Sequence, residues 1–353
     1  MGKGLKAQGL KARHVGTRAL VKTPPGPPFP RRGRRQQTAA AGGVSADLLS
    51  RIALLSLRPD VTHPASPYVG RRLAQLTPAI IGASSFACAD VMTKLTLQSG
   101  ADVLTMALFR GFIGLPLLAA WLLVGARPAP LTLRATWISL GIGVLFAGTV
   151  YGLFRAIEIV TVPVAILTYF VYPLLTGLAA AATGLERLGL RGAGAALAAF
   201  LGLALMIGAH PGGVALAGIA FGLAAASCRV LTLLIMRAKL AGADARLISW
   251  YSILSATLVF ALIALATWNW QGPQTLLGWS ALITGSVATT IAVLAVFIST
   301  ARVGAFRTAL FMNLEPLLAT IASAIVLGEV ITPLQAAGGA VMIGALVAFQ
   351  MRR

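Results

Sequence analysis

Residues 172–186 read YPLLTGLAAAATGLE, and residues 315–329 read EPLLATIASAIVLGE. The two stretches lie 143 residues apart, and at this separation Pro173 aligns with Pro316 while each stretch ends in a glutamate. Lys94 aligns with Arg237 at the same separation, and the tripeptide GAD occurs at 100–102 and again at 242–244, so the similarity extends across both halves of the chain. The sequence therefore predicts a tandem repeat, in which one structural unit occurs twice.

The composition of the chain indicates a membrane protein. Of its 353 residues, 58% are hydrophobic and 11% are charged, whereas about 25% of the residues of a soluble domain are charged. A bilayer core takes about 20 apolar residues per helix, and a helix satisfies its backbone polar groups within the segment. Such segments predict ten transmembrane helices, near residues 76–97, 102–124, 135–157, 162–182, 190–209, 214–236, 247–268, 276–300, 305–326 and 332–350.

The short connections between these helices predict the topology, because cytoplasmic loops are rich in Lys and Arg. Alternate connections and the C-terminus carry all the loop Lys and Arg, namely Arg127, Arg134, Arg187, Arg191, Arg237, Lys239, Arg246, Arg302, Arg307, Arg352 and Arg353. We therefore expect both termini in the cytoplasm. Each repeat contains five helices, an odd number, so the second copy enters the membrane in the opposite orientation, as in many secondary transporters.

With this repeat in view, the chain resembles the drug/metabolite transporter superfamily, EamA type. The resemblance is carried by Pro173 to Glu186-Arg187 in the first repeat. In the second it is carried by Pro316-Leu-Leu to Gly328-Glu329, followed by Gly338-Gly339 and Gly344. It covers about residues 73–350, and implies an all-α carrier fold of two inverted five-helix repeats without a named cargo. We assign residues 73–209 to the first repeat and 210–353 to the second.

The first 72 residues form a basic, Pro- and Arg-rich tail that we expect to be disordered and cytoplasmic. The tail accounts for much of the formal charge of +20, but its spacing does not suggest a folded nucleic-acid surface. Three readings stay open: an organellar transit peptide, a segment attracted to anionic lipids, or an over-extended start that is no part of the natural protein. Residues 47–58 can form a short amphipathic helix on the membrane surface.

Six ionisable residues fall inside the predicted spans, where a charge near the bilayer centre costs roughly 2.5 to 3.5 kcal/mol. Such residues usually face a partner or a watery cavity. Their summed charge of +2 leans toward anionic or zwitterionic cargo such as an amino acid. They are Asp90, Lys94, Arg110, Arg155, Arg229 and Glu315.

Asp90 and Lys94 lie four residues apart on one helix face and can pair with each other. With Arg110 they occupy the outer half of the first two helices and can line one cavity. Arg229 either lines an inner cavity or reaches the cytoplasmic headgroups. The candidate substrate-binding residues are Asp90, Lys94, Arg110, Arg229, Tyr172 and Tyr251.

Glu315 precedes Pro316, which removes a helix hydrogen bond. With Asp90, Glu315 is a candidate proton-coupling residue, although it can equally pin helices together. Arg155 is expected to pair locally with Glu158 rather than to bind substrate.

These features favour a secondary transporter that moves a small organic metabolite such as an amino acid by alternating access, either as an exporter or for uptake, with small-molecule substrate and lipids as its partners. A non-transporting scaffold or sensor is the alternative, and an intramembrane enzyme is a weaker one, since HExxH and GxSxG are absent. We expect no cofactor, no metal site and no nucleic-acid partner, because two cysteines and three scattered histidines offer no ligand spacing. Arg- and Ala-rich, Lys-poor usage favours a bacterial inner membrane. Substrate, direction, coupling ion and oligomeric state stay open.

Overall fold

A computed structural model describes residues 67–124, 128–208, 215–268, 270–328 and 330–351. Every described residue lies in the unit Pro64–Arg353. The amphipathic segment predicted at 47–58 and the three histidines, His14, His63 and His210, lie outside the described residues.

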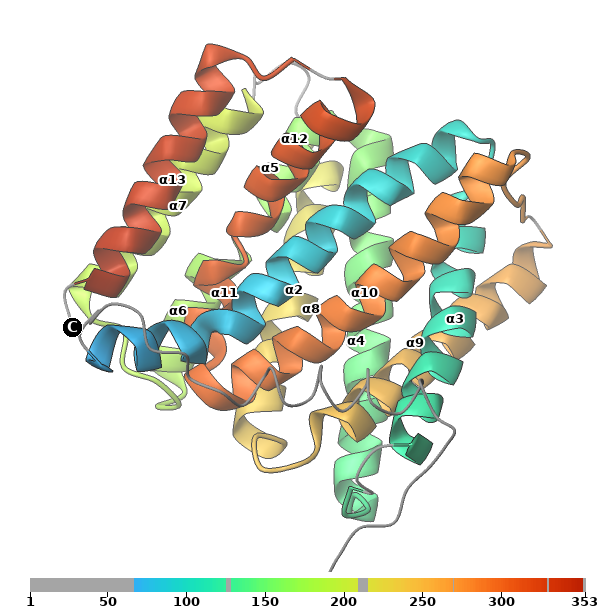
Figure 1. Ribbon diagram of the computed structural model, residues 1–353, viewed down its shortest axis with the longest axis horizontal. Coiled ribbons are helices and arrows are strands. Elements are labelled where there is room, and N and C mark those ends of the chain that lie inside the picture. The colour runs from blue at the N-terminus through green and yellow to red at the C-terminus, as the bar shows by residue number, and fades with distance from the viewer. Residues whose placement is uncertain (1–66, 125–127, 209–214, 269, 329, 352–353) are drawn as a thin grey trace, which may run out of the picture. The chain divides into compact units, whose positions relative to one another are not determined.

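The described chain is helical throughout (Figure 1). Its helices are α2 (Pro67–Gln98), α3 (Val103–Val124), α4 (Leu133–Ile159), α5 (Val162–Tyr169), α6 (Tyr172–Ala182), α7 (Leu190–Ile207), α8 (Leu216–Lys239), α9 (Ala245–Thr267), α10 (Leu276–Val303), α11 (Ala305–Phe311), α12 (Leu314–Leu327) and α13 (Pro333–Met351). Together they make ten spans that are long and apolar enough to cross a membrane. The prediction of ten spans is confirmed.

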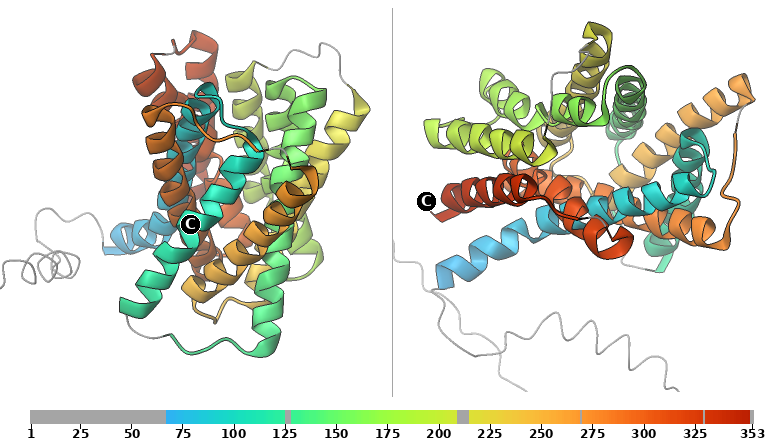
Figure 2. Two further views of the ribbon diagram at one scale, coloured as in Figure 1. Left: turned by 90° about the vertical axis from the view of Figure 1, so that its right-hand side faces the viewer. Right: turned by 90° about the horizontal axis from the view of Figure 1, so that it is seen from above.

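The packing of the helices follows the predicted repeat. Helix α2, the first of its repeat, packs along α10, the third of the other repeat; the equivalent helices α8 and α4 pack in the same way. Two further pairs, α3 with α9 and α7 with α13, each join equivalent helices of the two repeats. Figures 1 and 2 show α7 and α13 side by side. This arrangement is that of two five-helix units related by a pseudo-twofold axis.

The fourth helix of each repeat is broken near its middle. The sequence predicts a continuous helix at both places, near residues 162–182 and 305–326. The first break separates α5 from α6 at Phe170 and Val171, and the second separates α11 from α12 at Met312 and Asn313. A proline follows each break within a few residues, and proline lacks the N–H that would continue the helix. At the second break, the buried Asn313 amide donates to the Leu310 carbonyl at 2.9 Å. Such local bonding makes non-helical backbone tolerable at membrane depth.

The repeat separation of 143 residues pairs the positions after the two breaks. Tyr172 is therefore the structural equivalent of Glu315, and each directly precedes a proline. Broken helices at matching positions of inverted repeats commonly mark the substrate site of a transporter.

Glycines allow the closest helix contacts, and α7 with α13 provides a testable case. A Cβ atom built on Gly338 would lie 2.4 Å from the Met206 nitrogen and 2.5 Å from the Gly202 oxygen. Both atoms belong to the backbone and cannot move aside. Gly344, on the same helix, has nothing within 4 Å of its ideal Cβ position.

Gly338→Ala is expected to destabilise the folded protein by about 1–3 kcal/mol, the usual cost of overpacking. Gly344→Ala is the matched control and should be neutral or slightly stabilising, because alanine favours a helix over glycine. Thermal unfolding of the purified protein in detergent measures both. Equal melting temperatures for the two variants would contradict the close packing of α7 on α13.

Candidate functional site

Charged and aromatic side chains from six helices gather around the two breaks. Asp90 comes from α2, Arg110 from α3, Arg229 from α8 and Glu315 from α12, while Tyr169 and Tyr172 flank the first break. Electrostatic interactions link Asp90 with Arg110 and with Glu315, and link Arg229 with Glu315 and both tyrosines. We call these six residues the central cluster.

Arg229 is the most enclosed charged residue of the central cluster, with only 5% of its surface exposed. Its guanidinium carbon lies 5.6 Å from the centre of the Phe86 ring and 5.8 Å from that of Tyr172. Aromatic faces attract a cation and offset part of its desolvation. The Arg229 guanidinium interacts with the Tyr172 hydroxyl, but its buried Nε has no hydrogen-bond partner among the described residues. A donor of this buried positive charge is therefore left available.

Arg110 has a different environment. Its Nη2 donates to the Thr93 hydroxyl at 2.5 Å, and Asp90 is its charged neighbour. It lines a cavity of 30 Å³ together with Thr257, Thr290 and apolar side chains of α4 and α9. Arg229 lines a second cavity of 10 Å³ with Thr232 and Ser252. These volumes hold about one or two water molecules each, so the helices around them must separate before a metabolite can fit there.

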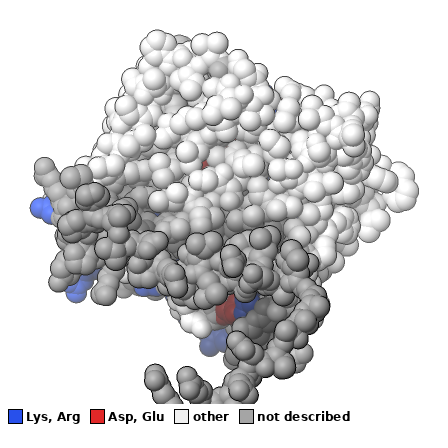
Figure 3. All heavy atoms as spheres, in the orientation of Figure 1, with Lys and Arg blue, Asp and Glu red and all other residues white. Residues whose placement is uncertain are grey.

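Asp90 and Lys94 differ from the two arginines because their side chains are exposed. Asp90 lies in the second half of the membrane span of α2, which runs from Ala74 to Gln98. A charged group within such a span usually faces a partner or a watery cavity rather than lipid. Figure 3 shows a small area of acidic colour within an otherwise uncharged face, where α2 and α12 are nearest the viewer. Lys and Arg are visible only at the left and lower edges of the same face.

The structure brings together four of the six predicted substrate-binding residues, Asp90, Arg110, Arg229 and Tyr172, and adds the coupling candidate Glu315. For Arg229 it favours an interior position over a headgroup contact, since the side chain is buried. Lys94 lies one helical turn beyond Asp90. Tyr251 packs its ring on that of Trp250, 5.2 Å away, and lines neither of the two internal cavities.

The local pairing predicted for Arg155 is confirmed, because the structure shows an ion pair between Arg155 and Glu158 at exposed side chains. Sequence reasoning missed Phe86 and Thr93. Both lie one turn from Asp90 on α2, four residues before and three residues after it. Helical spacing from a buried charge would have found them. Within the described residues, no three His, Cys, Asp or Glu side chains come close enough to hold a metal ion.

A model of the EamA-like transporter family matches residues 76–208 and 216–350, which are the two repeats. The chain belongs to the EamA-like transporter family. This membership makes it a membrane transporter, and members of this family are generally not enzymes. The family assignment does not specify a substrate.

Solved structures support the fold. One, titled "Crystal structure of protein", superposes with a TM-score of 0.63 at 19% sequence identity, covering 77% of this chain and 96% of that one. At that identity the likeness concerns the fold alone. No curated protein matches this EamA-like chain.

Proposed function

We propose that this EamA-like transporter is a secondary carrier for a small zwitterionic metabolite such as an amino acid, which binds at the central cluster. The observation that carries the proposal is the buried Arg229, whose Nε is unpartnered. A guanidinium binds a carboxylate through two parallel hydrogen bonds. A substrate carboxylate at this position would satisfy the donor that the protein leaves open.

The acidic half of the central cluster suits the other end of such a substrate. Asp90 and Glu315 interact electrostatically with each other, so two carboxylates share one region. A substrate ammonium group between them would reduce their mutual repulsion. The rings of Phe86 and Tyr172, which face Arg229, provide the apolar walls typical of a small-molecule site.

Alternating access supplies the transport mechanism in this proposal. The central cluster lies between two inverted repeats, where rocking of one repeat against the other exposes a fixed site to each side in turn. The sequence contains no Walker motif, so the driving energy would come from an ion or substrate gradient. Asp90 and Glu315 are the proposed proton carriers.

The placement of the basic loops supports an orientation. Among the described residues, the connections with Lys and Arg that follow α6, α8 and α10 lie at one end of the helices, which we call the basic end. The positive-inside rule places this end in the cytoplasm. We propose a bacterial inner membrane with both termini cytoplasmic.

Thermal-shift measurements on the purified carrier against a panel of amino acids and related metabolites test the substrate class. A zwitterionic ligand should raise the melting temperature of the wild type but not of Asp90→Asn or Arg110→Gln. The same measurement on Lys94→Gln and Tyr251→Phe tests those two residues. A smaller ligand-induced rise in melting temperature would place the substituted residue in the site. Stabilisation that is equal in wild type and in both cluster variants would refute the site. The absence of any stabilising ligand and of any transport would favour the scaffold or sensor alternative.

A further inference from the structure

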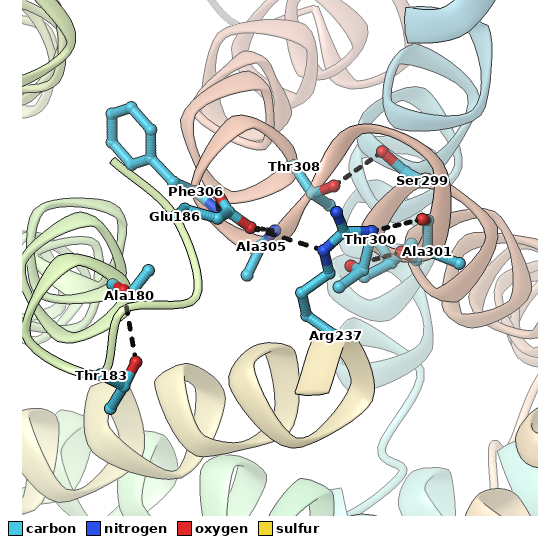
Figure 4. A network of polar contacts seen from close by, with 11 residues as sticks. Ala180, Thr183, Glu186, Arg237, Ser299, Thr300, Ala301, Ala305, Phe306 and Thr308 are labelled. Carbon is cyan, nitrogen blue, oxygen red and sulfur yellow. Dashed lines mark hydrogen bonds and ion pairs between the residues drawn. The ribbon is translucent and has the colours of Figure 1, made fainter. Parts of the chain in front are cut away.

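Glu186 fastens the two repeats together at the basic end (Figure 4). Its Oε1 accepts the Ala305 N–H at 2.5 Å, and its Oε2 accepts the Phe306 N–H at 3.2 Å. Glu186 follows α6 in the first repeat, whereas Ala305 and Phe306 begin α11 in the second. Hydrogen bonds to a carboxylate are stronger than those between neutral groups. One side chain therefore joins two units that must move apart for this end to open.

Arg237 completes the contact from α8. Its Nη1 donates to the Ala301 carbonyl at 2.7 Å, and its Nε lies 4.0 Å from the Glu186 Oε1. The side chain of Glu186 is 18% exposed and that of Arg237 is 34% exposed. Partial burial distinguishes this pair from the fully exposed ion pairs that contribute little. Figure 4 shows the Arg237 side chain reaching from α8 toward both Ala301 and Glu186.

The backbone beside Glu186 is shaped to admit its carboxylate. Gly304 joins α10 to α11 with a φ of +99°, a conformation that side-chain-bearing residues rarely adopt. A Cβ atom at this position would lie 2.5 Å from the Glu186 Oε1. Glycine is thus needed at position 304 both for the turn and for the space that Glu186 occupies.

An apolar contact accompanies the polar one. The Phe306 ring is packed against two glycines of the first repeat, Gly177 on α6 and Gly192 on α7. Cβ atoms at these positions would lie 2.8 Å and 3.0 Å from the ring. The Phe306 ring also lies beside that of Phe349, at 6.1 Å between centroids. Phe306 is only 6% exposed, so its side chain is buried next to the Glu186 contact.

The two ends of the bundle are not equivalent, although the repeats are. At the basic end α6 packs on α11 and α8 packs on α10. Among the described helices, the symmetry-equivalent pairs, α12 with α5 and α2 with α4, make no comparable contact at the opposite end. Other equivalent pairs differ in the opposite sense, because α2 packs more extensively on α12 than α8 does on α6. The opposite end also has hydrogen bonds between the repeats, in which the Gln271 N–H donates to Asp102 Oδ2 at 2.8 Å and the Gln274 N–H donates to the Ser99 carbonyl at 2.8 Å. The basic end differs in that a partly buried carboxylate, that of Glu186, joins the two repeats there.

We propose that Glu186 and Arg237 form a latch that holds the basic end closed, and that its release is the step that opens this end during transport. The proposal rests on the alternating-access function above. Neither residue belongs to the central cluster, so both act as positioning residues. They set the ratio of closed to open forms and do not bind substrate.

Distance measurements between spin labels test the latch without requiring a known substrate. Thr183→Cys and Arg302→Cys place labels at exposed positions after α6 and at the end of α10, in the full chain with Cys88→Ala and Cys228→Ala. With Glu186 intact we expect one short distance. Glu186→Ala should add a longer distance, raising the ratio of open to closed forms about tenfold, as expected when hydrogen bonds to a charged group are lost. Arg237→Ala should also add the longer distance, but with a smaller population.

Glu158→Ala is the matched control, because it removes a carboxylate from an exposed local ion pair. If Glu186→Ala does not fold, Glu186→Gln retains one acceptor oxygen and should still produce a smaller long-distance population. An unchanged distance in the Glu186 variants, or an equal change in Glu158→Ala, would overturn the latch. A longer distance in the Glu186 variants, with no compound transported by the wild type, would support the latch and count against the transport proposal.

Discussion

Arg229→Gln is expected to weaken binding of the transported ligand, lowering its affinity about tenfold to a hundredfold. Glutamine can offer one amide donor pair but neither the charge nor the planar fork that matches a carboxylate. The loss of hydrogen bonds to a charged group accounts for a change of this size. Titration of the ligand against the purified protein, followed by tryptophan fluorescence or calorimetry, gives the affinity. Uptake into proteoliposomes gives the transport rate.

Two further variants separate binding from folding in this experiment. Removing Arg229 leaves Glu315 without its positive neighbour, and an unpaired charge in the protein interior is destabilising. Arg229→Gln combined with Glu315→Gln restores the charge balance, so it should recover stability but not ligand affinity. Arg155→Gln is the matched control, since it removes an exposed arginine that also lies over an aromatic ring, that of Phe221. Wild-type affinity in Arg229→Gln would place the substrate elsewhere.

The ten spans and their repeat were predictable from sequence because the bilayer imposes a strong rule. Every backbone group in lipid must be bonded within a helix, so apolar length alone located the spans. The breaks in the fourth and ninth spans were not predicted, although Pro173 and Pro316 mark them. Proline kinks some helices and interrupts others, and which occurs depends on local partners. At Asn313 such a partner is a side-chain amide bonded to a carbonyl three residues earlier.

The site was predictable in composition but not in geometry. Charges inside apolar spans identified Asp90, Arg110, Arg229 and Glu315, because lipid penalises each of them. Which of them are neighbours depends on how each helix is rotated about its axis, and the nearly uniform apolar sequence carries little information about that rotation. Tyr251 illustrates the consequence: it is a plausible wall residue by composition, yet its ring packs on Trp250.

The Glu186 contact at the basic end could not be read from sequence at all. A transporter uses one sequence in at least two conformations, so the sequence specifies both and distinguishes neither. The repeat pairs Glu186 with Glu329, which lies outside the described residues. Only the structure shows that Glu186 contacts the start of α11 in this conformation.

Glu315→Gln is expected to uncouple transport from a proton gradient while preserving ligand binding. A carboxylate at the second break, beside Asp90 and Arg229, can take up a proton as the substrate leaves and release it as the substrate returns. An amide keeps the size and the hydrogen-bonding capacity of the side chain but cannot exchange a proton. Proteoliposomes with an imposed pH gradient should therefore lose substrate accumulation by about tenfold or more, since free energy from the gradient no longer enters the cycle.

Counterflow supplies the decisive comparison, because it exchanges labelled for unlabelled substrate without net proton movement. Glu315→Gln should retain counterflow near the wild-type rate, and Asp90→Asn should show the same separation if both carboxylates carry the proton. Glu158→Gln, which alters an exposed carboxylate outside the central cluster, should change neither measurement. Loss of counterflow together with accumulation would assign Glu315 to substrate binding or helix packing instead. Unchanged accumulation in both amide variants would exclude proton coupling through the two carboxylates, leaving another ion or the substrate gradient itself as the driving force.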